Sequence, residues 1–282
     1  MIVAGIQMDI AWEDPGENFR RVEELALRAM EGFHGHIDST GPENAAEDFD
    51  ATPRLLVLPE MFATGFSMNA EKVSAFAQET RAFLASLASR LSVFVLGGYA
   101  EPAEPLPANA CSIFAPGGEE LLHYRKLHPF SLAKEDRHYI GGEAMETAEL
   151  EGVRVTPLIC YDLRFPEPFR PAARNTDLYC VIANWPDMRR EAWTTLLRAR
   201  AIENQAFVLG VNRVGVAGEK PHAGDSALVD PMGKVVGDVK AYEEGVVWGS
   251  VDPQEVVRVR RRLSFLKDRR PDLYRRLEDS CS

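Results

Sequence analysis

The chain has 282 residues, of which 45% are hydrophobic and 27% charged, and its formal net charge is −11. This balance is typical of a folded protein, so it excludes intrinsic disorder for the body of the chain. No apolar run approaches the ~20 residues that a membrane-spanning helix needs, and the acidic charge argues against nucleic acid or anionic membranes as partners.

The first elements of the chain alternate between strand and helix patterns. Apolar residues alternate over residues 1–8, which predicts a strand, and Asp14-Pro15 then predicts the start of a helix with Asp14 as its cap. Residues 34–53 are polar and rich in turn residues, so we predict a surface insertion there. The apolar run at residues 55–58 is typical of a strand that is buried on both faces.

The remaining elements continue this alternation. No Pro- or Ser-rich linker divides the chain, so we expect one α/β domain with mixed sheets. We predict helices over roughly 74–91 and 191–204, strands over 93–99, 153–159, 178–183, 206–212 and 246–251, and hairpins joining 109–114 to 119–126 and 227–229 to 235–236.

The last thirty residues are rich in arginine. Interleaved apolar residues such as Val256, Leu263 and Phe265 favour a tail that packs across a partner subunit. The alternative is a solvated helical face, on which acids such as Asp268 and Asp272 balance the arginines.

The N-terminus and the cysteines indicate the compartment. The first fifteen residues contain neither a basic region nor a small-residue cleavage site, so we expect no signal peptide. The four cysteines fit no disulfide framework and no metal-ligand spacing. We therefore expect a cytoplasmic protein with reduced thiols and without a metal site. Cys111 and Cys180 lie inside apolar strands and are interpreted as inert core.

Three polar residues follow predicted strands directly: Glu60, Lys126 and Cys160. Ligand sites in α/β folds gather at the carboxyl ends of strands, so these side chains are candidates for one site. A lysine ammonium favours a neighbouring thiolate and can stabilise an oxyanion, while a carboxylate can move protons. Together they suit acyl transfer through a thioester. Singly, each has a structural interpretation: a helix start, a surface lysine and a buried cysteine.

The sequence around these residues resembles a known family. The segments LPEMF (58–62), YRKLH (124–128) and ICYDLRFPE (159–167) are similar to the signature segments of the nitrilase superfamily of carbon–nitrogen hydrolases. The resemblance covers roughly residues 1–266. Segments 59–68 and 183–186 resemble the omega-amidase-like branch, whose members hydrolyse the terminal amide of 2-oxo dicarboxylic monoamides such as 2-oxoglutaramate and 2-oxosuccinamate.

The resemblance implies a fold and a set of roles. It implies a four-layer αββα sandwich with two mixed β-sheets over residues 1–266 and a homodimer. The pattern of the last residues adds a C-terminal tail over 267–282 that packs at the dimer interface. Glu60 would be general base and acid, Lys126 would stabilise the oxyanion, and Cys160 would be the nucleophile. The backbone N–H of Tyr161 would be the second oxyanion donor. Glu135 would position Lys126 and the substrate amide; its alternative is a surface helix residue.

Other residues are expected to shape the pocket. We expect Arg189 to anchor the substrate carboxylate, with a solvated helix start as the alternative. Phe62, Trp185 and, with the weakest support, Phe66 are expected to wall the pocket. Arg164 is expected to brace the nucleophile turn by pairing with Glu167 or Asp162, and His128 to act as a hydrogen-bonding brace.

The function expected from these residues is cysteine-dependent hydrolysis of a small linear amide to acid and ammonia, without a cofactor. The alternatives within the family are an N-carbamoyl amino acid or nitrile hydrolase. Outside it, the alternative is a catalytically silent protein that uses the pocket to bind a metabolite or partner. The expected partner is a small-molecule amide.

Overall fold

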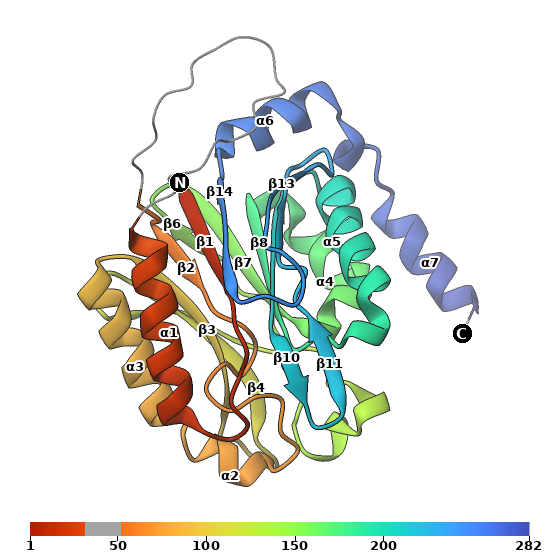
Figure 1. Ribbon diagram of the computed structural model, residues 1–282. Coiled ribbons are helices and arrows are strands. Elements are labelled where there is room, and N and C mark those ends of the chain that lie inside the picture. The colour runs from red at the N-terminus through yellow and green to blue at the C-terminus, as the bar shows by residue number, and fades with distance from the viewer. Residues whose placement is uncertain (32–51, 282) are drawn as a thin grey trace.

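Two six-stranded sheets pack face to face between two layers of helices (Figure 1). The computed structural model describes residues 1–31 and 52–281. Helices α1 (Pro15–Met30) and α3 (Ala77–Leu91) cover one sheet, while α4 (Pro166–Ala172) and α5 (Arg190–Asn204) cover the other. The predicted four-layer αββα sandwich is therefore confirmed. The insertion predicted at 34–53 lies almost wholly outside the described residues.

The first sheet carries the N-terminal strands. Its order is β14-β1-β2-β3-β4-β5; β1, β2 and β3 are parallel, whereas β14, β4 and β5 pair antiparallel with their neighbours. The strands are β1 (Ile2–Gln7), β2 (Leu55–Val57), β3 (Phe94–Glu101), β4 (Ala108–Phe114), β5 (Glu120–Arg125) and β14 (Gly245–Ser250).

The second sheet has the order β13-β12-β9-β8-β7-β6, with β7, β8 and β9 parallel. Its strands are β6 (Ala148–Leu150), β7 (Val153–Ile159), β8 (Leu178–Ala183), β9 (Phe207–Asn212), β12 (Ala227–Val229) and β13 (Val235–Asp238). A separate two-stranded ribbon is formed by β10 (Val214–Ala217) and β11 (Lys220–Ala223). The sequence predicted neither this ribbon nor β6.

The core explains why β2 is apolar at every position. Leu55 and Val57 pack into the cluster between the two sheets, while Leu56 packs into the cluster beneath α1 and α3. Alternate side chains of a strand face opposite sides, so a strand covered on both faces has no polar position. The sheets approach so closely that a Cβ at Gly5 would lie 2.6 Å from the Val211 side chain.

The helix boundaries follow local signals in part. The side chain of Asp14 accepts from the Glu17 N–H and caps α1, as predicted. The helix predicted over 74–91 begins at Ala77 as α3, because Phe76 adopts φ −84° and ψ 1°, outside the helical range; a separate short helix, α2 (Ala70–Ser74), precedes it.

The C-terminal segment folds over one end of the sandwich and then leaves it. In α6 (Pro253–Arg262), Arg260 donates to the carbonyl oxygens of Thr176, Asn204 and Gln205. Helix α7 (Pro271–Cys281) extends away from the body in Figure 1. Among the helices of the described residues, none is long and apolar enough to span a bilayer.

Candidate active site

The ends of β2, β5 and β7 bring Glu60, Lys126 and Cys160 together. Lys126 Nζ lies 3.1 Å from Glu60 Oε1, and both side chains are buried. Cys160 lies close enough to both residues for their charges to alter its pKa. The geometry therefore unites the three residues at strand ends, as the sequence predicted.

Three donors fix the orientation of the Glu60 carboxylate. Its Oε1 accepts from Asn109 Nδ2 at 2.7 Å as well as from Lys126, and its Oε2 accepts from the backbone N–H of Asn184 at 2.8 Å. These donors come from β4, the end of β5 and the end of β8. The carboxylate is thus held by both sheets of the sandwich.

Glu135 is the fourth member of this buried group. It follows Lys134, which has φ 61°, and begins the short 3-10 helix η2 (Glu135–Arg137). Its carboxylate accepts from Lys126 Nζ at 2.9 and 3.1 Å and from Asn109 Nδ2 at 3.0 Å. The alternative interpretation as a surface residue is wrong. Only Glu135 turns inward, while Lys134 and Asp136 beside it are exposed.

The electrostatics of this group keep Lys126 charged. Burial alone would lower the pKa of Lys126, but the carboxylates of Glu135 and Glu60 outweigh it and raise that pKa above its ordinary value. Burial also raises the pKa of Glu135, against the opposing effect of Lys126. Lys126 is therefore a fixed cation at the base of the site.

Cys160 sits in a turn with left-handed backbone conformation. It has φ 47° and opens the 3-10 helix η3 (Cys160–Arg164) directly after β7. Burial and the charge of Glu60 raise the pKa of its thiol well above the ordinary value, although Lys126 acts in the opposite direction. The sequence predicted that Lys126 favours the thiolate; here that effect is outweighed. The surroundings thus favour the thiol over the thiolate at Cys160, so attack by this sulfur would require a base.

Asp162 braces the nucleophile turn. It accepts from the Ile159 N–H at 3.0 Å and from the Tyr124 hydroxyl at 2.7 Å, and its Oδ1 lies 2.8 Å from His128 Nδ1. The predicted bracing role of His128 is therefore confirmed. The pairing predicted for Arg164 is wrong, because its guanidinium instead lies 4.8 Å from the centre of the Trp185 ring.

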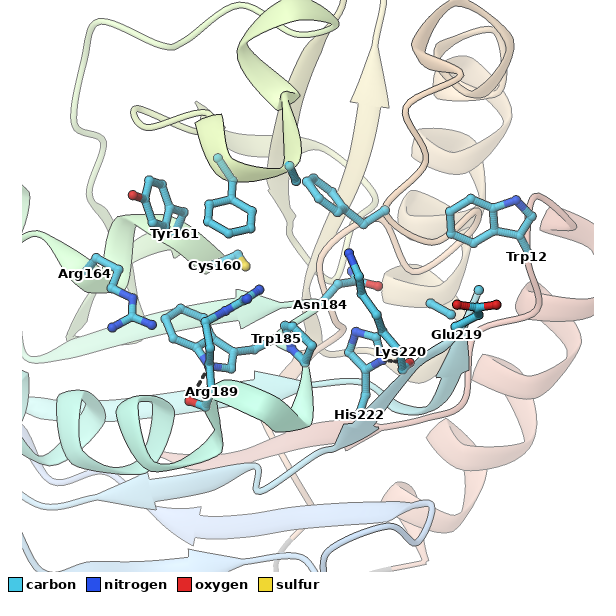
Figure 2. A pocket seen from close by; sticks show the side chains of 16 residues that line it. Trp12, Cys160, Tyr161, Arg164, Asn184, Trp185, Arg189, Glu219, Lys220 and His222 are labelled. Carbon is cyan, nitrogen blue, oxygen red and sulfur yellow. Dashed lines mark hydrogen bonds between the residues drawn. The ribbon is translucent and has the colours of Figure 1, made fainter.

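A cavity of about 550 Å³ opens in front of Cys160 (Figure 2). Five of the residues predicted for the site line it: Phe66, Cys160, Tyr161, Trp185 and Arg189. Glu60, Lys126 and Glu135 lie behind this wall. The cavity is also lined by Trp12, Phe130, Arg164, Asn184, Lys220, His222 and one carboxylate, that of Glu219.

Phe62 does not wall this cavity, contrary to the prediction. It is fully buried in the cluster beneath α1 and α3, with its ring centre 6.1 Å from that of Phe19 and 6.0 Å from that of Phe83. The turn after β2 directs it to the helix side of the sheet. Phe66, four residues later, does line the cavity, and Lys126 Nζ lies 5.1 Å from the centre of its ring.

Two arginines face the cavity without acidic partners. Arg189 lies 5.0 Å from the Phe130 ring centre, and Arg164 lies over Trp185. Within the described part of the chain, neither guanidinium has a hydrogen bond or an ion pair. Burial lowers the pKa of Arg189, yet a guanidinium stays protonated in proteins. Their donors are thus available to an anionic ligand.

Sequence reasoning missed several residues of the site. Asn184 follows β8 directly, so the strand-end rule that found Glu60 would also have found it. Lys220 and His222 come from the unpredicted ribbon. His222 Nδ1 lies 3.0 Å from the Lys220 carbonyl oxygen, and burial lowers the pKa of His222 to about 4, with Arg213 contributing.

Comparisons with known proteins agree on one family. A family model described as carbon-nitrogen hydrolase matches residues 2–261. Omega-amidase YafV of Escherichia coli (strain K12) is 35% identical over 239 residues, 84% of each chain. The 2-oxoglutaramate amidase of Bacillus subtilis (strain 168) is 31% identical and covers 96% of this chain and 98% of its own. A similar solved structure is that of XC1258 from Xanthomonas campestris, a CN-hydrolase superfamily protein with an arsenic adduct in its active site. The two structures superpose with a TM-score of 0.83 at 31% sequence identity, over 96% of this chain and 97% of XC1258.

Proposed function

The chain belongs to the carbon–nitrogen hydrolase family, and on that premise we propose that it hydrolyses the terminal amide of 2-oxo dicarboxylic monoamides, such as 2-oxosuccinamate and 2-oxoglutaramate. The names of its amidase relatives support this substrate class. The site supports it as well, because the half-buried Cys160 lines a cavity whose unpaired arginines favour an anionic ligand, with the buried Glu60 behind it.

The observation that carries the proposal is the pair of arginines without acidic partners. Arg164 and Arg189 are both held on aromatic rings beside the nucleophile. Planar guanidinium groups bind carboxylates through paired hydrogen bonds. An amide whose far end is a carboxylate would thus be held with its carbonyl carbon toward Cys160. Arg189 is the anchor expected from the sequence, and Arg164 joins it.

The buried residues then perform acyl transfer. Glu60 accepts the thiol proton as Cys160 sulfur forms a bond to the amide carbon. Lys126 Nζ and the Tyr161 N–H stabilise the oxyanion. Glu60 returns the proton to the nitrogen, the carbon–nitrogen bond breaks, and ammonia leaves. Water then attacks the thioester while Glu60 accepts its proton, and the acid and the free thiol are released. Glu135 holds Lys126 in place.

The test is ammonia release from a panel of substrates by the unchanged protein and by Cys160→Ala. The panel contains both 2-oxo amides, glutamine, an N-carbamoyl amino acid and an aliphatic nitrile. We expect rapid release from the 2-oxo amides and none after the substitution. Release from only another member of the panel would overturn the substrate class, and activity that survives in Cys160→Ala would overturn the mechanism.

The assembly and the compartment complete the proposal. We propose a cytoplasmic homodimer in which the tail over 267–282 packs at the interface, with neither nucleic acid nor membrane as a partner. Tyr274 and Leu277 on α7 are large hydrophobic side chains that are exposed in the single chain, and a partner subunit in the proposed dimer would cover them. Cys111, Cys160 and Cys180 are free thiols, which suits a reducing compartment.

A further inference from the structure

Asn184 carries a buried side-chain oxygen without a hydrogen-bond partner at the wall of the catalytic cavity. The residue is 6% exposed, and its Oδ1 accepts no hydrogen bond within the described structure. Asn184 also lines the cavity, and Figure 2 shows it beside the space in front of Cys160. Buried polar atoms in folded proteins are nearly always paired, so this atom points to a donor that arrives with a ligand.

The hydrogen bonds of Asn184 fix which way its amide faces. Nδ2 donates to the backbone carbonyl oxygen of Glu60 at 2.6 Å, and the Asn184 backbone N–H donates to Glu60 Oε2 at 2.8 Å. The groups of Glu60 that face Asn184 are both acceptors, so only the NH₂ of the amide can face them. Oδ1 must therefore face away from Glu60.

The remaining donors of the site do not satisfy Oδ1. Lys126 Nζ is shared by Glu60 and Glu135, and Asn109 Nδ2 donates to the same two carboxylates. In the proposed reaction Lys126 and the Tyr161 N–H also bind the carbonyl oxygen of the substrate. These donors are thus engaged with other acceptors, and a substrate bound in the cavity can bring the donor that Oδ1 lacks.

A 2-oxo dicarboxylic monoamide has only one group that donates. Its carboxylate and its 2-oxo group are acceptors, whereas its carboxamide nitrogen carries two N–H bonds. We propose that Oδ1 of Asn184 accepts a hydrogen bond from the amide nitrogen of the substrate, the atom that leaves as ammonia. The inference rests on the proposed amidase function and makes Asn184 a specificity-determining residue for primary amides.

This contact would orient the leaving nitrogen. With one N–H on Asn184, the plane of the carboxamide is fixed relative to Cys160, and the nitrogen lies next to the Glu60 carboxylate that protonates it. An ester of the same acid has no N–H at that position, so it leaves Oδ1 unpaired. Sites built to bind a donor discriminate strongly against analogues that lack it.

The test compares an amide with its ester. The value of kcat/KM is measured for 2-oxosuccinamate and for the corresponding methyl ester, because kcat/KM reports the steps through acylation and excludes the shared hydrolysis of the thioester. We expect Asn184→Ala to lower kcat/KM for the amide by about 10–100-fold and the amide-to-ester ratio by roughly tenfold. A ratio that stays unchanged would overturn the proposal and leave Asn184 as a support for Glu60 alone.

Asn109→Ala is the matched control. Asn109 also holds the Glu60 carboxylate and also has an unpaired Oδ1, but it does not line the cavity. Its loss should lower amide and ester hydrolysis together. If the unchanged protein hydrolyses no 2-oxo amide, the proposed function fails, and the ratio is measured on whichever primary amide of the panel is cleaved. Failure to cleave any primary amide would overturn this inference too.

A crystal structure of Cys160→Ala with bound amide tests the contact without altering Asn184. We expect the amide nitrogen within hydrogen-bond distance of Asn184 Oδ1, at about 2.8–3.2 Å. An amide whose nitrogen faces another group would contradict the inference, whether or not Asn184→Ala folds.

Discussion

Lys126 and Glu135 form an ion pair from which solvent is excluded, with Nζ 2.9 Å from Oε2 and side chains that are 1% and 0% exposed. Burying two charges is unfavourable unless geometry and further hydrogen bonds compensate for lost hydration. Here Glu60, Asn109 and the Phe130 N–H supply those bonds. The pair therefore holds the Lys126 cation rigidly in place, as the proposed oxyanion-stabilising role requires.

Glu135→Gln should impair catalysis more than folding. The substitution keeps the shape but removes one of the two charges that hold Lys126, so the ammonium is free to shift toward Glu60. We expect kcat to fall by about 100-fold, as for the loss of an oxyanion-stabilising group, with a smaller change in KM. Steady-state kinetics and thermal unfolding check this. Asp136→Asn, in the exposed neighbour, is the control and should change kcat less than about twofold.

Glu60→Gln should abolish hydrolysis and yet make Cys160 easier to ionise. The charge of Glu60 raises the pKa of the thiol, so its removal lowers that pKa, while the base needed for attack is lost. The measurement is the alkylation rate of Cys160 by iodoacetamide as a function of pH. We expect the midpoint to move to lower pH in Glu60→Gln and to higher pH in Lys126→Met. Shifts in the same direction would contradict the assigned charges.

The sequence predicted those parts of the site that follow from strand ends. Glu60 and Cys160 come after continuous apolar strands, and the layered fold makes such ends converge. Glu135 was predicted only through the family resemblance, because its polar neighbours give the local sequence the pattern of an exposed segment. Asn109 was missed because it lies within a strand, where polar residues usually face solvent. Sequence periodicity does not report which way a side chain faces after a turn. The prediction that Phe62 walls the pocket was therefore wrong.

The sequence pattern did not predict the ribbon of β10 and β11, for a related reason. Its strands contain Gly215 and Pro221, and its side chains do not alternate between exposed and buried, because residues 218–221 are all exposed and His222 and Ala223 are both buried. A short strand pair that packs against the cavity instead of a sheet gives no hydrophobic alternation to detect. Tertiary packing, and not local preference, places Lys220 and His222 at the site.

Arg189→Met should weaken binding of anionic amides selectively. If its guanidinium holds the substrate carboxylate, its loss should raise KM for 2-oxosuccinamate by about 10–100-fold, as expected for a charge-assisted hydrogen bond. Hydrolysis of the neutral butyramide should change little. Arg190→Met is the control, since Arg190 pairs with Asp225 at 2.7 Å instead of facing the cavity. Equal losses for anionic and neutral amides would contradict the role of Arg189 as anchor.

His222 should make the fold less stable in mild acid. Its imidazole is 4% exposed and donates from Nδ1 to the Lys220 carbonyl, because a carbonyl oxygen only accepts. Burial and Arg213 lower its pKa from 6.5 to about 4. Between these two values the unfolded chain binds a proton that the folded protein does not, so the free energy of unfolding falls as the pH falls through this window.

The size of this effect follows from the two pKa values. Between pH 7 and pH 5, His222 should reduce the free energy of unfolding by about 2 kcal/mol. His222→Gln removes the titrating group and keeps a polar side chain. Between pH 7 and pH 5 the variant should therefore lose about 2 kcal/mol less unfolding free energy than the unchanged protein. Urea unfolding at pH 7 and pH 5 gives the loss of unfolding free energy for each protein, and the two losses are then compared. Carboxylates that titrate in both proteins contribute equally to both losses and cancel in the comparison. An identical loss of stability in both would contradict this prediction and show that folding does not lower the pKa of His222.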